Sequence, residues 1–96
     1  MDLSKALRNV MTTGKVLIGY RETKKGLHEK IVKMVVVSSN CPKEVLEEFQ
    51  KFNVPLITFE GTNVNLGAVC GKPFSISTLA IIDPGESNIM AAVGKP

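Results

Sequence analysis

The sequence has little of what catalytic and metal sites usually need. Its 96 residues include a single histidine, His28, and two cysteines, Cys41 and Cys70, which stand far apart and form no Cys-x-x-Cys pair. An isolated imidazole is typical of an exposed helix residue, and separated thiols are typical of reduced core or cap positions. No pair of acids stands at a spacing recognisable as a general acid and base. We therefore expect no enzyme activity, no metal site and no cofactor.

Long apolar runs are missing as well. No hydrophobic stretch approaches the roughly 18 residues of a membrane span. The N-terminus lacks the basic segment followed by an apolar one that marks a signal peptide. The chain shows no internal repeat, linker or low-complexity segment. We expect one domain over residues 1–96, soluble and cytoplasmic, without a membrane partner and monomeric when free.

Positive charge is distributed unevenly around a net charge of +3. Residues 1–33 carry eight basic and three acidic side chains, a balance of +5. Residues 34–96 carry four basic and six acidic side chains, a balance of −2. This asymmetry favours a polyanionic partner, because phosphate contacts dominate affinity for nucleic acids. A solvated basic helix face explains the charge pattern at least equally well.

Hydrophobic periodicity predicts helices alternating with strands. The expected helices cover residues 3–13, 23–29, 42–53 and 62–70, and the expected strands cover residues 16–18, 34–37, 56–59 and 76–82. A turn at 83–85 and a brief helical turn from Ser87 to Met90 follow, and Val93–Pro96 is expected to fray. The alternation indicates an α/β fold with helices on both faces of the sheet. By itself, it predicts a parallel sheet.

Several burial predictions follow from the same pattern. Leu27 and Ile31 are spaced by four and should form the thin apolar face of the second helix. In the fourth helix, three side chains are expected to point inward, namely Val64, Ala68 and Val69. Gly67 should let that helix approach the sheet closely.

Residues 61–74 combine a short helix with a loop suited to base stacking. Thr62 or Asn63 can cap the helix, and Gly71 can end it in a left-handed conformation. Lys72-Pro73-Phe74 then supplies a cation, a rigid proline and an aromatic ring before the last strand. Such a loop can present the ring to a nucleotide base. Phe74 could instead turn inward as the first core residue of that strand.

Two junctions after strands are further candidates for ligand contact. Gly19 allows close approach of a ligand to the backbone, and the helix that follows brings basic side chains and free N–H groups to the same corner. An ordinary strand-to-helix loop fits equally well. Asn40 follows the second strand, and its amide can donate to or accept from a base edge. Alternatively, it closes its own turn by bonding to the backbone.

The ordered set of motifs resembles the thirty-e type of large-subunit ribosomal protein, in the archaeal and eukaryotic superfamily that binds RNA kink-turns. The resemblance covers nearly the whole chain. The motifs that carry it are Thr13-Gly14-Lys15, Gly19-Tyr20-Arg21, Phe59-Glu60-Gly61 through Leu66-Gly67, Gly71-Lys72, Phe74 and Asp83-Pro84-Gly85-Glu86-Ser87. This family has an acidic residue before Leu-Gly, where this chain has Asn65. A contact that requires a carboxylate at that position is therefore in doubt.

This resemblance implies a three-layer α-β-α sandwich around a mixed four-stranded sheet. It also implies a structural constituent of the large ribosomal subunit that binds a kink-turn in ribosomal RNA, with neighbouring ribosomal proteins as further partners. Segments 19–24, 38–42 and 71–75 would gather at one edge of the sheet. The RNA contacts carried over by the resemblance are Gly19, Arg21, Lys24, Asn40, Gly71, Lys72 and Phe74.

Two alternative functions remain to be compared with this one. A kink-turn binder can serve another ribonucleoprotein, and an α/β domain can bind a small ligand. Gly71-Lys72 superficially resembles a phosphate-binding loop. That pattern fails because Leu66 stands at its first glycine position and Pro73 replaces its Ser or Thr.

Overall fold

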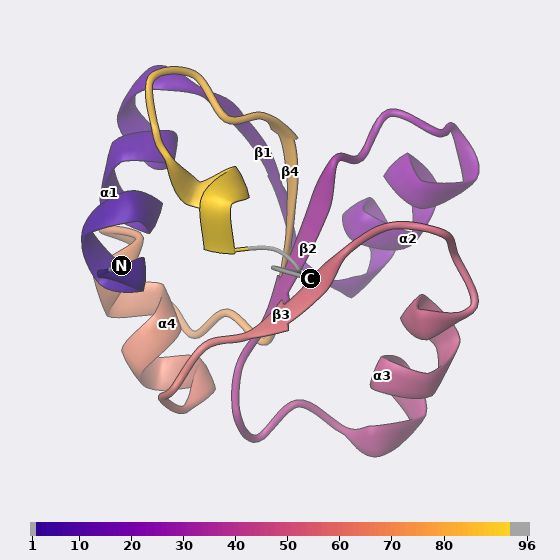
Figure 1. Cartoon of the computed structure of the whole chain (residues 1–96). Coiled ribbons are helices and arrows are strands. Elements are labelled where there is room, and N and C mark those ends of the chain that lie inside the picture. Colours follow the sequence, from indigo (N-terminus) through magenta and orange to yellow (C-terminus); the bar gives the residue numbers. More distant parts are fainter. Residues whose placement is uncertain (1, 93–96) are drawn as a thin grey trace.

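Four strands form one mixed sheet in the computed structural model, which describes residues 2–92 (Figure 1). The strands are β1 (Lys15–Ile18), β2 (Met34–Val37), β3 (Leu56–Thr58) and β4 (Thr78–Asp83), in the order β1-β4-β2-β3. β4 is antiparallel to both of its neighbours, and β2 is parallel to β3. The mixed sheet implied by the resemblance is confirmed, and the parallel sheet predicted from alternation alone is wrong.

Helices cover both faces of this sheet, as expected for the α/β class. They are α1 (Leu3–Thr13), α2 (Tyr20–His28), α3 (Lys43–Gln50), α4 (Asn63–Val69) and the 3-10 helix η1 (Ile89–Ala92). α1, α4 and η1 lie on one face, and α2 and α3 lie on the other (Figure 1). No helix in the described part of the chain is long and apolar enough to span a bilayer. The predicted fraying of Val93–Pro96 falls outside the described residues.

The direction of β4 follows from the turn of the chain after α4. The seven residues of α4 span about 10 Å. The chain reverses at Gly71, whose φ is +75°. β4 therefore begins at the same edge where β2 ends, with Thr78 opposite Val37, and must run antiparallel to β2.

The buried strand β2 explains the run of consecutive valines. All four of its residues are buried, and they alternate between two cores. Met34 and Val36 pack in the core beneath α1 and α4, and Val35 and Val37 pack in the core beneath α2 and α3. A central strand covered on both faces needs apolar side chains at every position.

Several predicted boundaries are wrong. α2 begins at Tyr20 rather than near residue 23, because Gly19 alone turns the chain with a φ of +101°. Segment 19–24 is therefore mostly helix and not a loop. Ile31 lies beyond α2 and is 42% exposed, so it does not anchor that helix. α3 ends at Gln50 rather than near residue 53, and β4 begins at Thr78 rather than at Ile76.

The inward face of α4 also differs from the prediction. Val64 is 66% exposed and Ala68 is exposed, whereas Val69 packs against the core as expected. The buried positions are Leu66 and Gly67. A Cβ at Gly67 would overlap the carbonyl oxygen of Phe74, so the close approach is to the following loop and not to the sheet.

Candidate RNA interface

Four segments of the chain meet at one edge of the sheet, at its lower end in Figure 1. The N–H of Gly19 donates to the carbonyl of Thr78 (3.0 Å), and the N–H of Ser38 donates to the carbonyl of Ser77 (2.9 Å). The N–H of Ile76 donates to the carbonyl of Asn63 (2.9 Å). We call this edge the rim, comprising residues 19–21, 38–41, 62–64 and 71–77. The first residues of segments 19–24 and 38–42 thus contact the chain just after segment 71–75.

The side chain of Asn40 joins two parts of the rim. Its Oδ1 accepts from the Ser38 hydroxyl (2.8 Å) and from the backbone N–H of Asn63 (2.9 Å). Its Nδ2 donates to Oδ1 of Asn63 (3.0 Å). One alternative predicted that the Asn40 amide bonds to the backbone of its own turn. The amide does bond to backbone, but its backbone partner is Asn63, 23 residues away. One of its two N–H donors has no acceptor among the described residues.

Asn63 is the rim residue that sequence reasoning missed. The sequence indicates Asn63 only as a possible cap, yet Thr62 is the cap and accepts from the N–H of Asn65 (3.4 Å). A helix start with two adjacent cap candidates needs only one of them. The second polar side chain is then free for another partner. Two adjacent cap candidates in the sequence are therefore the signal that points to Asn63.

Asn65, which departs from the family pattern, has a structural role at the start of α4. Its Oδ1 accepts from the Thr62 N–H (3.0 Å) and the Thr62 hydroxyl (3.0 Å). Together with the bond from Asn65 N–H to Thr62 Oγ1, this completes a capping box. The box needs an oxygen acceptor rather than a negative charge, so the amide maintains the helix start.

Gly71 ends α4 in the predicted left-handed conformation. Its N–H donates to Ala68 O (3.0 Å), and the N–H of Lys72 donates to Gly67 O (3.0 Å). These two bonds define a Schellman motif, which satisfies the last carbonyls of the helix and reverses the chain. Lys72 and the residues after it are thereby directed back toward the rim.

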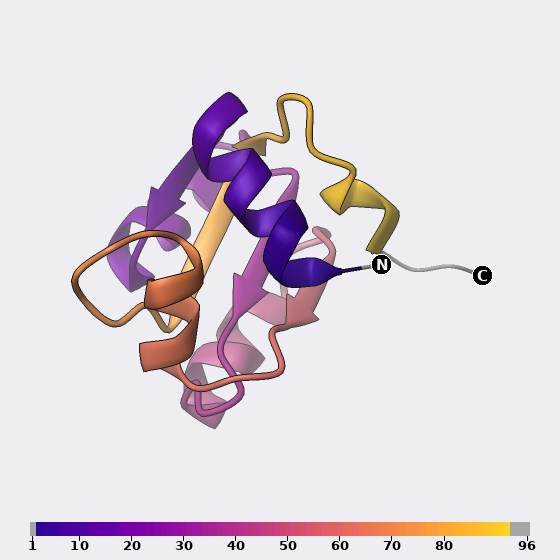
Figure 2. The ribbon, with the colours of Figure 1, turned by 90° about the vertical axis from the view of Figure 1, so that its left-hand side faces the viewer.

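Phe74 presents its ring to solvent on the returning segment. It is 53% exposed, so it does not turn inward as a core residue. The backbone of Phe74 packs against α4 so closely that a Cβ at Gly67 would overlap the Phe74 carbonyl oxygen. Figure 2 shows this orange segment projecting beyond α4 from the body of the fold. Nearby, Val64 on α4 adds a second exposed apolar side chain.

Two predicted RNA contacts on α2, Arg21 and Lys24, have different surroundings. Nζ of Lys24 pairs with Oε2 of Glu48 on α3 (3.1 Å), and the Tyr20 hydroxyl donates to the other oxygen of Glu48 (2.6 Å). The bond to Glu48 raises the pKa of Lys24, and the bonds from Tyr20 and then Lys24 lower the pKa of Glu48. Lys24 is thus held toward α3. Arg21 is exposed and has no ion-pair partner among the described residues.

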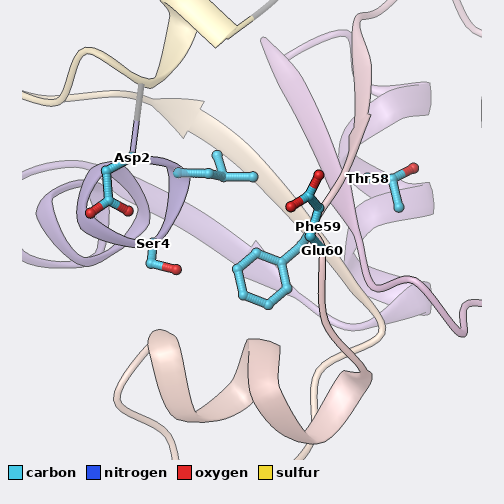
Figure 3. A pocket seen from close by; sticks show the side chains of 6 residues that line it. Asp2, Ser4, Thr58, Phe59 and Glu60 are labelled. Atoms are coloured by element: carbon cyan, nitrogen blue, oxygen red, sulfur yellow. The ribbon is translucent and has the colours of Figure 1, made fainter.

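A cavity lined by residues outside the rim does not suit an anion. It has a volume of about 420 Å³ and lies between the start of α1 and the end of β3 (Figure 3). The carboxylates of Asp2 and Glu60 stand on opposite sides of it in Figure 3. The described residues contain no group of three or more side chains that could hold a metal ion. The lining of this cavity thus contains two carboxylates and no cation that could pair with a phosphate.

Comparison with known proteins gives one family over almost the whole chain. The model of the ribosomal protein L7Ae/L30e/S12e/Gadd45 family matches residues 1–91. A large ribosomal subunit protein eL30 from Methanosarcina mazei is 47% identical over 92 residues, which cover 96% of this chain and 89% of that protein. The eL30 protein of Methanothermobacter thermautotrophicus is 40% identical over 98 residues, which cover 98% of this chain and all of that protein.

Proposed function

The chain belongs to the ribosomal protein L7Ae/L30e/S12e/Gadd45 family, and from this premise we propose that it is a structural, non-enzymatic constituent of the large ribosomal subunit. Its relatives at 36–47% identity are named as large ribosomal subunit proteins, which supports this role. The proposed partner is a kink-turn in ribosomal RNA, bound by the rim in the cytoplasmic ribosome.

The observation that carries the proposal is the chemistry gathered on the rim. Sequence-specific RNA recognition targets unstacked bases, because the major groove of a regular A-form helix is too deep and narrow for side chains to read. The half-exposed ring of Phe74 offers a stacking surface for such a base. The remaining N–H of Asn40 can donate to a base acceptor, and the unpaired Arg21 can bind phosphate.

Glycines at two corners of the rim allow the RNA backbone to come close. Gly19 and Gly71 both have positive φ, and a Cβ at either position would meet no atom within 4 Å. The space beside them is therefore open. Lys72 follows Gly71 and adds a cation at the point where the chain turns back.

The rim is held in shape without RNA. Asn40 and Asn63 link two of its segments, and the packing of Gly67 against Phe74 fixes a third. Preorganised contacts cost less conformational entropy on binding. A bent RNA can reach all three segments together, whereas a straight duplex offers no extruded base to Phe74.

Lys24 has a secondary role in this proposal. Its ammonium group is bonded to Glu48, so a direct RNA contact would require that ion pair to break. We therefore assign Lys24 to the positive field of α2, with Arg21 as the direct contact from that helix.

A titration of kinked RNA against a straight duplex, at two salt concentrations, tests this function. Phe74→Ala should weaken binding of the kinked RNA by about 1–3 kcal/mol while the protein stays folded, because one stacking contact is lost. Ile31→Ala is the matched control, since Ile31 is also exposed (42%) but follows α2 at its other end.

Equal binding of kinked and straight RNA would contradict the proposal, as would equal affinities of the two alanine variants. Tight binding of a kink-turn from a non-ribosomal RNA, with weak binding of ribosomal kink-turns, would instead support the alternative of another ribonucleoprotein.

A further inference from the structure

A shallow depression beside the rim separates α1 from the end of α4. It has a volume of about 240 Å³ and is lined by Arg8, Met11 and Thr12 of α1 and by residues 68–71. Figure 2 shows α1 and α4 side by side on this face, with the segment after α4 projecting next to them. Gly71 belongs both to this depression and to the rim, so the two surfaces are continuous.

Arg8 is the one charged residue that lines this depression. It is exposed, and the described residues include no carboxylate in an ion pair with it. Three acids share a cavity with residues of α1, namely Asp2, Glu60 and Glu86, and none of them lines this depression. The lining therefore contains one cation and no acid.

The end of α4 does not require Arg8 as a cap. The carbonyl of Leu66 already accepts from Cys70 N–H, and those of Gly67 and Ala68 accept from Lys72 and Gly71. An arginine near a helix end often satisfies such carbonyls, but here the backbone does so. The guanidinium group is thus left available for a partner outside the chain.

We propose that Arg8 binds the phosphate backbone of one of the two RNA stems that flank the kink, so that the interface extends from the rim onto α1. This inference rests on the proposed function. A regular stem is recognised through its backbone, and a guanidinium group binds phosphate with two parallel hydrogen bonds. The lining contains no second cation, and Met11 and Val69 make part of it apolar, which suits an extended surface contact better than a small anion.

Arg8→Gln and Lys5→Gln form a matched pair for the test. Both remove one exposed cation from α1, but Lys5 lines a different cavity, with Glu86. Fluorescence anisotropy with a kink-turn RNA, over a series of salt concentrations, gives the affinity and its salt dependence. Arg8→Gln should reduce the slope of log K against log salt by about 0.7–0.9, which corresponds to one phosphate contact. Lys5→Gln should leave the slope close to that of the wild type.

Trimming each RNA stem in turn identifies the partner of Arg8. Shortening one stem should weaken binding to the wild type and have no effect on Arg8→Gln, whereas shortening the other should weaken both proteins equally. Circular dichroism confirms that each variant is folded.

Equal effects of Arg8→Gln and Lys5→Gln, or additive effects of Arg8→Gln with both trimmed stems, would overturn the inference. Failure of the proposed function appears separately, as a wild-type protein that does not distinguish kinked RNA from straight RNA.

Discussion

Replacing Asn40 with alanine removes the amide that joins two segments of the rim. The change deletes one bond from the Ser38 hydroxyl and two bonds with Asn63, at 2.8–3.0 Å. A hydrogen bond contributes about 0.5–1.5 kcal/mol net, with low values where water can replace the partner. Water reaches Asn63, but Ser38 is only 1% exposed and would lose its acceptor in a buried place.

We therefore expect Asn40→Ala to lower the free energy of unfolding by about 2.5 kcal/mol, at the high end of the range for the bond from Ser38 and the low end for the two with Asn63. For a domain of this size, that loss corresponds to a decrease in Tm of about 10–20 °C. RNA affinity should fall as well, because the rim loses both a link and a donor.

Asn40→Asp separates the two roles of this side chain. A carboxylate still accepts from Ser38 Oγ and from the N–H of Asn63, and its second oxygen can accept from the Asn63 amide once that amide turns over. Stability should stay within about 1 kcal/mol of the wild type. RNA binding should be lost, because a negative charge replaces the remaining donor and repels phosphate.

Urea denaturation followed by circular dichroism, together with anisotropy titrations of kinked RNA, measures both effects. An Asn40→Ala protein as stable as the wild type would show that the three bonds contribute nothing to the fold. An Asn40→Asp protein with wild-type affinity would remove Asn40 from the RNA interface.

Two further predictions concern α4 and the contact between α2 and α3. Gly67→Ala should destabilise the protein by about 1–3 kcal/mol, because the new Cβ overlaps the Phe74 carbonyl. This loss includes the helix propensity of alanine, which favours the variant by about 1 kcal/mol. An unchanged midpoint of urea denaturation would contradict the prediction. The lowered pKa of Glu48, due to Tyr20 and then Lys24, means that its contribution to stability is present above its ordinary value of 4.5 and is lost as the pH falls below it. The stability difference between wild type and Glu48→Gln should therefore shrink in acid, and a constant difference would refute the argument. The raised pKa of Lys24 predicts a corresponding loss only as the pH rises above its ordinary value of 10.5.

Local features of this fold could be predicted from the sequence because they depend on neighbouring residues. Asp2 caps α1 by accepting from Lys5 N–H (3.2 Å), Thr62 caps α4, and Gly71 ends α4 with a positive φ. The predicted strand at residues 34–37 is present, and its run of apolar residues is buried. In each case the backbone conformation or the local run of apolar side chains is sufficient to specify the structure.

The start of α2 could not be predicted because tertiary contacts stabilise it. Tyr20 is a weak helix start, yet its ring stacks on Phe49 of α3 (5.7 Å between centroids), and Thr23 is fully buried on the inner face of α2. These contacts stabilise a first turn that the sequence pattern does not favour. The ion pair of Lys24 with Glu48 likewise joins α2 to α3, and the sequence of neither helix indicates that the two lie close together.

The sequence by itself determined the α/β class, the helix caps and the family resemblance, because these follow from local hydrogen bonding, periodicity and the order of motifs. Only the tertiary structure decided which polar groups meet on the rim. Asn40 follows β2 and Asn63 follows β3, and the two become partners because these strands are parallel neighbours whose ends lie at the same edge. β4 begins at that edge because it runs antiparallel to β1 and β2, which brings residues 71–77 there as well. Strand order and register arise from long-range burial, and no local pattern contains that information.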